Sequence, residues 1–187
     1  MKDKDFDRGL GTRLRFLREG QGLSLGALAD RSGVSKAMIA RVEKAQSSPT
    51  AALLGRLCAG LGVRLSSLIE AADRRSEPLS RFRDQPAWRD PKTGYLRRQV
   101  SPSGASSGLE IASISLPPGM KVPYRAWTAN AYRQQLVMLA GTLHLQMGNE
   151  NYILRKGDCL DFDVLSPNTF ENKGRACARY LIVIRKD

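Results

Sequence analysis

The sequence has few of the residue types that build metal centres, disulfide scaffolds or membrane spans. Its 187 residues include one histidine, His144, and three cysteines. Cys58, Cys159 and Cys177 have neither the paired motif nor the spacing of zinc ligands. No apolar run is long enough to cross a membrane, and the charged amino terminus, MKDKDFDRGLGTR, lacks the apolar core of a signal peptide. We therefore expect a cytoplasmic protein that does not bind membranes.

Positive charge is in excess, and the excess is larger toward the amino terminus. The chain holds 30 Lys and Arg against 18 Asp and Glu. Lys and Arg outnumber Asp and Glu by 12 to 7 in residues 1–70, by 8 to 4 in residues 71–99 and by 10 to 7 in residues 100–187. Such an excess is typical of nucleic-acid binders, because it attracts phosphates in a salt-dependent way. The charge excess alone is equally consistent with binding to another acidic partner.

Residues 23–49, LSLGALADRSGVSKAMIARVEKAQSSP, carry the pattern of two short helices joined by a tight turn. Ser24 can cap the first helix, because its hydroxyl can accept a hydrogen bond from an amide that the first turn leaves unpaired. Gly33 can adopt the left-handed conformation that ends a helix, and Ser35 can cap the next one. The pattern predicts a helix-turn-helix.

The second of these helices has two different faces. Ile39 and Val42 point inward with Val34. The outward residues are Lys36, Ala37, Ala40 and Arg41. Such a face suits the DNA major groove, because small residues permit close approach to base edges while Arg and Lys pair with guanine or phosphate. For an isolated helix, an ordinary solvated face is the alternative.

Residues 10–70 resemble the five-helix DNA-binding domain of the Xre and Cro/C1 family of bacterial and phage regulators. The motifs that carry the resemblance are LRxxR at 14–18, LSLxxLA at 23–29, GVSxxxIxxVE at 33–43, SSPT at 47–50 and LGVxLSSL at 61–68. The resemblance implies an all-α five-helix domain that binds a double-stranded DNA operator as a homodimer.

The same resemblance assigns roles to individual residues. It implies that Arg18 pairs with Glu43 across the first and third helices, as a structural ion pair. The residues that it places at or near DNA are Arg13, Ser24, Lys36, Ala37, Ala40, Arg41, Lys44, Ser47 and Ser48. Since Ala37 has no hydrogen-bonding group and Leu25 replaces a frequent polar groove contact, readout by hydrogen bonds would depend on Lys36 and Arg41. Arg41 is the residue that we expect to recognise the DNA base sequence.

The helical pattern stops after Ile69. Residues 71–93 bring three prolines, many charges and few apolar residues, which predicts a linker. We therefore expect a DNA-binding domain at 1–70, a linker at 71–93 and a second domain at 94–187. Short strands separated by turn residues predict an all-β sandwich or barrel for this second domain. The predicted strands are residues 95–100, 109–116, 136–139, 142–147, 152–154, 159–162 and 180–184.

Residues 116–174 resemble the conserved core of the cupin superfamily, a small antiparallel jelly-roll barrel. The motifs are PPG at 117–119, VMLAGTLHLQMG at 137–148, YILRKGDCLDF at 152–162 and SPNTFEN at 166–172. An Xre-type helix-turn-helix fused to a cupin is the architecture of a known class of bacterial regulators. The two resemblances together cover nearly the whole chain.

The resemblance does not extend to the cupin metal ligands. Members that bind metal use two histidines, a glutamate and a further histidine, and the matching positions here are residues 127–130, Gln134 and Asn168. His144 stands between two leucines, where a packed histidine is more common than a ligand. We therefore expect no metal, no cofactor and no enzyme activity. A metal-independent cupin enzyme tethered to a helix-turn-helix is the alternative.

A barrel without a metal can still hold a small molecule. The residues expected around its pocket are Tyr124, Trp127, Tyr132, Gln134, His144, Asn168 and Phe170. They combine apolar surface with a few directional hydrogen-bonding groups, as ligand sites do. The sequence thus predicts a sequence-specific transcriptional regulator that senses a small organic effector, and family habit favours a repressor. Core filling by these aromatics would instead make the barrel a dimerisation module.

Overall fold

The computed structural model describes residues 2–69, 78–102, 107–127 and 132–185. The chain divides into two units, Met1–Asp73 and Arg74–Asp187. None of the helices in these described ranges is both long enough and apolar enough to span a bilayer.

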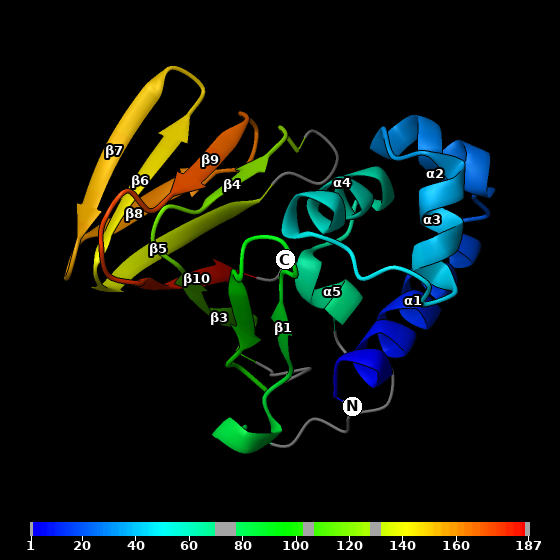
Figure 1. The fold of residues 1–187 in the computed structure, drawn as a ribbon, viewed down its shortest axis with the longest axis horizontal. Coiled ribbons are helices and arrows are strands. Elements are labelled where there is room, and N and C mark those ends of the chain that lie inside the picture. The colour runs from blue at the N-terminus through cyan, green and yellow to red at the C-terminus, as the bar shows by residue number, and fades with distance from the viewer. Residues whose placement is uncertain (1, 70–77, 103–106, 128–131, 186–187) are drawn as a thin grey trace. The chain divides into compact units, whose positions relative to one another are not determined.

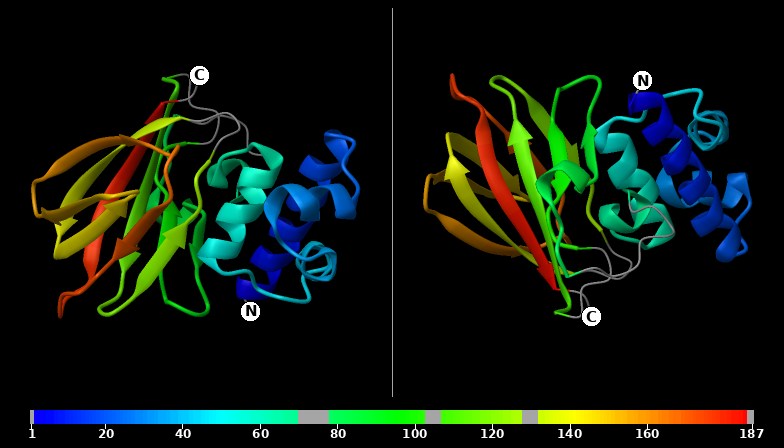
Figure 2. Two further views of the ribbon diagram at one scale, coloured as in Figure 1. Left: turned by 90° about the horizontal axis from the view of Figure 1, so that it is seen from above. Right: turned by 90° about the horizontal axis from the view of Figure 1, so that it is seen from below.

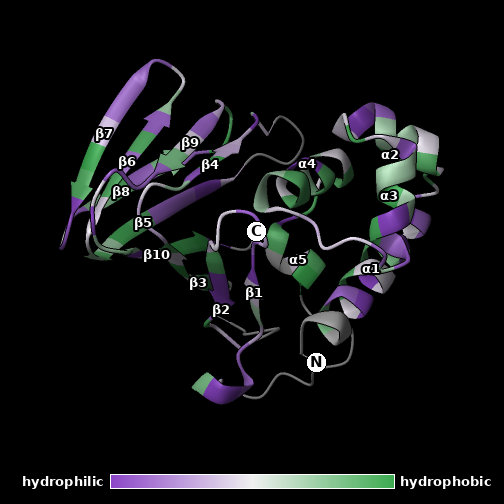
Figure 3. Cartoon of the chain, in the orientation of Figure 1, coloured by the Kyte–Doolittle hydropathy of each residue, from purple (hydrophilic) through white to green (hydrophobic). Residues whose placement is uncertain are grey.

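Unit 1 is helical (Figure 1). Its helices are α1 (Lys2–Gly20), α2 (Leu25–Ser32), α3 (Lys36–Glu43), α4 (Ala51–Leu61) and α5 (Leu65–Ile69). The prediction of a five-helix domain is confirmed. Helix α4 is largely hydrophobic, as its colour in Figure 3 shows, and its buried residues form much of the core. It begins where Thr50 accepts a hydrogen bond from Leu53 N, and it ends at Gly62 in the left-handed conformation.

Helix α1 packs closely against the end of α3, and Gly11 makes this approach possible. A Cβ atom added at Gly11 would lie 2.5 Å from the carbonyl oxygen of Val42, which is too close for any side chain. Leu14, one turn further along α1, is fully buried. The position of α3 is therefore fixed by backbone contact as well as by apolar side chains.

Unit 2 consists of two antiparallel sheets, which face each other in Figure 2. Its strands are β1 (Ala87–Arg89), β2 (Leu96–Gln99), β3 (Leu109–Leu116), β4 (Lys121–Tyr124), β5 (Arg133–Ala140), β6 (Thr142–Met147), β7 (Glu150–Arg155), β8 (Cys159–Asp163), β9 (Asn168–Glu171) and β10 (Ala178–Arg185). One sheet has the order β1-β2-β3-β10-β5-β8 and the other β4-β9-β6-β7. The prediction of an all-β second domain is confirmed.

Buried and more exposed side chains alternate along the strands, so each sheet has an inner and an outer face. In β10, Tyr180, Ile182 and Ile184 are buried, and the residues between them are less so. Tyr180 stands opposite Ile114 of β3 and Met138 of β5, both of which are buried as well. The core of unit 2 therefore lies between the two sheets, on the side to which these residues point.

The predicted linker at 71–93 is too long. Its later part contains a 3-10 turn, η1 (Phe82–Asp84), and strand β1, which pairs with β2 at the edge of the larger sheet. Trp88 is only 3% exposed, and its ring centroid lies 6.2 Å from that of Tyr95. A three-residue strand between Pro86 and Pro91 is too short to show a pattern of alternation, so the sequence suggested a loop.

Two further strands, β4 and β9, were not predicted. Pro123 lies inside β4 and Pro167 directly precedes β9, and proline normally argues against a strand. These two strands pair with each other. Strand β5 begins at Arg133 and not at Leu136, because its polar first residues also pair with β8.

Candidate functional site

The turn between α2 and α3 has the geometry that its sequence suggests. The Ser24 hydroxyl accepts a hydrogen bond from Ala27 N at 3.0 Å, and Gly33 ends α2 with φ of 65°. The Ser35 hydroxyl accepts one from Met38 N at 3.3 Å and thereby begins α3. Capping at both sides of the turn stabilises the angle between the two helices. Ser24 is therefore engaged as a cap.

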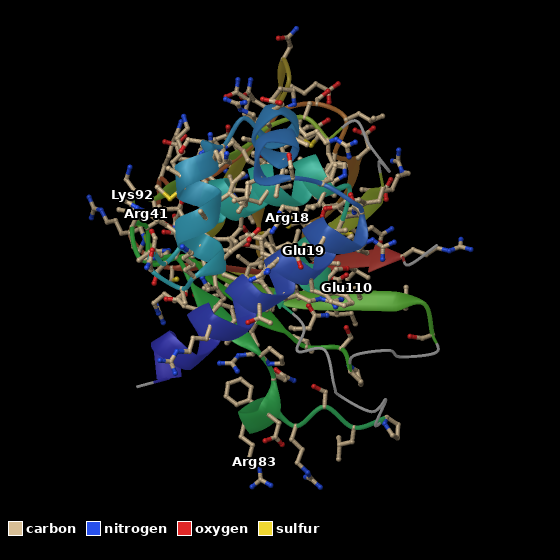
Figure 4. The ribbon with its side chains drawn as sticks, turned by 90° about the vertical axis from the view of Figure 1, so that its right-hand side faces the viewer. Arg18, Glu19, Arg41, Arg83, Lys92 and Glu110 are labelled. Atoms are coloured by element: carbon tan, nitrogen blue, oxygen red, sulfur yellow. The ribbon has the colours of Figure 1, made fainter. Side chains whose placement is uncertain are left out.

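Helix α3 presents the predicted small and basic face. Ile39 and Val42 are buried in unit 1. Lys36, Ala37 and Arg41 are exposed, Ala40 is half-buried, and Lys44 is exposed at the end of the helix. Figure 4 labels Arg41 on this helix. Because no large side chain stands between these basic groups, the face could approach the floor of a DNA groove.

Arg18 and Glu43 meet across α1 and α3. Arg18 Nε lies 2.7 Å from Glu43 Oε1, and Arg18 Nη2 lies 2.9 Å from Glu43 Oε2. Arg18 Nη1 donates a third hydrogen bond, to the carbonyl of Leu23 at 2.8 Å. The hydrogen bond to Glu43 outweighs burial and raises the pKa of Arg18 above its ordinary value. This pair of hydrogen bonds between Arg18 and Glu43 holds α3 at a defined angle to α1.

The residues predicted near phosphates make contacts inside unit 1. Arg13 Nε donates to the carbonyl of Ser67 in α5 at 2.9 Å, and its guanidinium stands 5.3 Å from the ring centroid of Phe16. The Ser48 hydroxyl donates to the carboxylate of Asp7. Ser47 is half-buried and lines a recess beside the start of α3. Arg13 and Ser48 therefore have protein partners that a phosphate would have to displace or share.

The interior of unit 2 holds most of the residues predicted around the effector pocket, in a chain of aromatic contacts. The ring of Phe170 stacks on Tyr180 at 6.0 Å between centroids and meets the edge of Tyr124 at 5.8 Å. The ring of Trp127 meets that of Tyr132 at 5.8 Å. Tyr124 is strongly desolvated, and burial raises its pKa well above the ordinary tyrosine value. These side chains supply a largely apolar wall.

Gln134 and Asn168 are the two amides of the predicted pocket, and both are buried. Gln134 lies on β5 opposite Phe162 of β8. Asn168 lies on β9 opposite Tyr124 of β4. The amides thus come from the two opposed sheets, and each has an aromatic neighbour across its strand.

His144 does not belong to this group. Leu143 and Leu145 on either side of it are buried in the interior, so His144 points to the outer face of the smaller sheet. Its cross-strand neighbours there are Ile153, which is exposed, and Glu171. The prediction that His144 lines the pocket is wrong, because a strand turns alternate side chains to opposite faces.

The structure adds a buried ion pair that the sequence did not indicate. Arg97 of β2 and Glu110 of β3 are 7% and 0% exposed, and Arg97 Nη2 lies 3.1 Å from Glu110 Oε1. One weak sequence signal could have indicated that Arg97 is buried. Arg97 lies two residues from both Tyr95 and Gln99, so the three side chains share one face of the strand. Arg98 beside it faces the other way and stands 4.2 Å from the ring centroid of Phe82.

Metal binding was not expected here. Within the described ranges, no three His, Cys, Asp or Glu side chains come together as metal ligands do. Of the positions matched to the first cupin ligands, Trp127 is described, and residues 128–130 lie outside the described residues. The side chains at the other matched positions, Gln134 and Asn168, are neutral amides, which are weak ligands for transition metals.

Comparison with known proteins supports the assignment of the helix-turn-helix in unit 1. The family described as "Helix-turn-helix domain" matches residues 9–71. The HTH-type transcriptional regulator SutR of Escherichia coli (strain K12) is 47% identical over 62 residues, which are 33% of this chain and 35% of SutR. The chain therefore matches about a third of the length of this curated relative.

Two solved structures resemble the chain over different spans. The crystal structure of an HTH_3 family transcriptional regulator from Vibrio cholerae has a TM-score of 0.80 and 25% identity, and the alignment covers 99% of each chain. The Cupin_2 domain of an XRE family transcriptional regulator from Enterobacter cloacae aligns with 50% of this chain and 97% of that one, at 17% identity and a TM-score of 0.45. The first of these similarities extends through both units.

Proposed function

We propose that this chain, whose residues 9–71 match a helix-turn-helix domain, is a homodimeric Xre-type transcriptional regulator with a cupin-like β-unit, and that it binds operator DNA through α3. The outward face of α3 is the observation that carries the proposal. Lys36, Ala37 and Arg41 are exposed together, while Ile39 and Val42 anchor the helix in unit 1. The caps at Ser24 and Ser35 make this face rigid, as recognition of base edges requires.

Unit 2 supplies a surface suited to dimerisation. On the outer face of the larger sheet, Leu181 stands beside Val137, and Val183 stands beside Ile111. All four are half-buried, and Leu139 on the same face is 44% exposed. An apolar stripe on an outer sheet face favours a second copy, because two-fold pairing buries the same stripe twice. A dimer also matches the two half-sites that helix-turn-helix proteins use.

We further propose that the interior of unit 2 binds a small organic effector without converting it. The effector would control DNA affinity by favouring one arrangement of the two DNA-binding domains, and only to the extent that it binds this arrangement better. Half-sites lie about 34 Å apart, so a change in the distance between the domains changes operator affinity. By analogy with the family that the chain resembles, we expect the regulator to repress transcription. We expect it to act in the cytoplasm, where bacterial DNA lies.

The test is selection of DNA from a random pool by the full-length protein. We expect enrichment of an inverted repeat whose half-sites lie about one helical turn apart. Leu181→Asp should convert a dimer into a monomer in sedimentation experiments and abolish selection of the repeat. Gln146→Asp, at an exposed position of β6 in the smaller sheet and therefore away from this stripe, is the matched control. A pool with no enriched sequence would contradict sequence-specific binding.

A further inference from the structure

A charged pair lies in the interior of unit 2, although most interior residues are apolar. The Arg97 guanidinium and the Glu110 carboxylate are both desolvated, and a single hydrogen bond of 3.1 Å between them is described. Burial opposes the charge of Arg97, but Tyr95, Glu110 and other neighbours outweigh it and raise the pKa of the guanidinium. Arg97 therefore stays positively charged inside the unit.

The ion pair is close to the predicted effector residues. Glu110 of β3 and Gln134 of β5 stand on opposite sides of Ile184 of β10, and all three are buried on the same face. Adjacent strands are about 4.8 Å apart, so the backbones of Glu110 and Gln134 are separated by roughly 10 Å. The Arg97 guanidinium, bound to Glu110, therefore lies at the same end of the interior as Gln134.

A second donor nearby has no acceptor. Trp127 is 8% exposed, and its indole Nε1 is a buried nitrogen without a hydrogen-bond partner. Its ring contacts Tyr132, which also interacts electrostatically with Arg97. An indole N–H and a guanidinium can only donate hydrogen bonds, so neither can satisfy the other. A buried donor without an acceptor is destabilising, and a bound acceptor would remove this cost.

We propose that the interior of unit 2 binds a small molecule through an oxyanion, a carboxylate or phosphate group, that accepts hydrogen bonds from Arg97 and from Trp127 Nε1. This inference rests on the proposed effector-sensing function and names the chemical class of the effector. Glu110 accepts a hydrogen bond from Arg97 Nη2, and the oxyanion would accept hydrogen bonds from other N–H groups of the guanidinium. The aromatic wall around Phe170 suits the apolar remainder of the molecule.

Nuclear magnetic resonance of the full-length protein can test this inference. The chain has two tryptophans, so Trp88→Phe assigns the indole N–H signal of Trp127. The probes are acetate, benzoate and inorganic phosphate, with acetamide and benzamide as uncharged counterparts at equal ionic strength. We expect a saturable shift of the Trp127 signal with oxyanions and none with amides. Saturation by phosphate or by the carboxylates alone identifies which group the site takes.

A double variant tests the role of the guanidinium. Arg97→Gln alone leaves Glu110 buried without its cation and risks unfolding, so we combine it with Glu110→Gln. The folded double variant should need about tenfold more oxyanion for the same shift, because charge-assisted hydrogen bonds are lost. Arg98→Gln, next in sequence but on the opposite face of β2, should respond like the wild type. An unchanged response in the double variant would overturn the inference.

Operator affinity, measured separately with and without each probe, distinguishes this inference from the proposed function. Oxyanion binding that leaves operator affinity unchanged supports the site and removes sensing from the proposed function. If amides shift the Trp127 signal as well as acids do, or if no oxyanion gives saturation, the oxyanion site is wrong, whereas sequence-specific DNA binding is unaffected.

Discussion

Arg18 of α1 and Glu43 of α3 form a two-point contact, with nitrogen–oxygen distances of 2.7 and 2.9 Å. Their side chains are 9% and 8% exposed. The pair connects the first helix of unit 1 to the last residue of α3, the helix proposed to enter DNA. It therefore couples the stability of the domain to the orientation of its recognition face.

Glu43→Ala should destabilise unit 1 strongly. It leaves the Arg18 guanidinium with only the Leu23 carbonyl and the half-exposed Glu19 carboxylate as described acceptors, and removing one partner of a buried pair typically costs about 3–5 kcal/mol. The double variant Arg18→Met with Glu43→Leu should recover most of this loss, because it removes both charges. Urea unfolding measures the effect. Asp30→Ala, which removes an exposed carboxylate of α2, is the control and should change little.

Arg41→Ala should reduce sequence preference more than general affinity. Loss of a bidentate base contact costs roughly 1–3 kcal/mol for the preferred operator. Competition between the selected operator and unrelated DNA of equal length measures this difference. Arg31→Ala, an exposed arginine at the end of α2, should alter the two affinities equally. If Arg41→Ala lowered the affinity for the operator and for unrelated DNA equally, Arg41 would have no role in recognising the base sequence.

Asp7→Asn should strengthen DNA binding of every sequence. Asp7 accepts a hydrogen bond from Ser48, which we expect to lie near a phosphate. Its negative charge would repel that phosphate, and one charge at a few ångströms in a solvated site is worth about 1 kcal/mol. The expected gain is about fivefold, and it should shrink at high salt. Asp30→Asn, exposed on α2, is the matched control, and an equal gain there would show only a general charge effect.

The helix-turn-helix was predictable because its signals are local. Ser24, Gly33 and Ser35 act within three or four residues of their own positions, so the sequence alone defines where α2 ends and α3 begins. The Arg18 to Glu43 contact joins residues 25 apart in sequence. From the sequence, the family resemblance is what predicts this pairing.

The interior of unit 2 was less predictable, because its chemistry depends on strand pairing. Arg97 and Arg98 are adjacent and chemically identical, yet only Arg97 points inward. The register of β10 against β3 and β5 places Glu110 and Gln134 on either side of Ile184, and the long Arg97 side chain reaches Glu110 from β2. His144 was misplaced for the same reason, since a difference of one residue along a strand reverses the face.

The shifted pKa values of Tyr124 and Tyr180 predict a loss of stability at alkaline pH. Burial is the main cause that raises the pKa of Tyr124 and of Tyr180 well above 10, and negative charge on Tyr95 would add to it. In the unfolded chain both ionise near pH 10. Their contribution to stability is therefore fully present below about pH 10 and is lost as the pH rises from there toward the raised values of the folded protein.

The loss should amount to about 1.4 kcal/mol per pH unit for each tyrosine in this range. Urea unfolding at a series of alkaline pH values measures it. Tyr180→Phe keeps the ring stacked on Phe170 but cannot ionise, so its unfolding free energy should fall less steeply with pH. Tyr152→Phe is the control, because Tyr152 is solvated and its pKa is raised mainly by its hydrogen bond to Glu150. Equal slopes for wild type and Tyr180→Phe would mean that Tyr180 ionises as easily in the folded protein as in the unfolded chain.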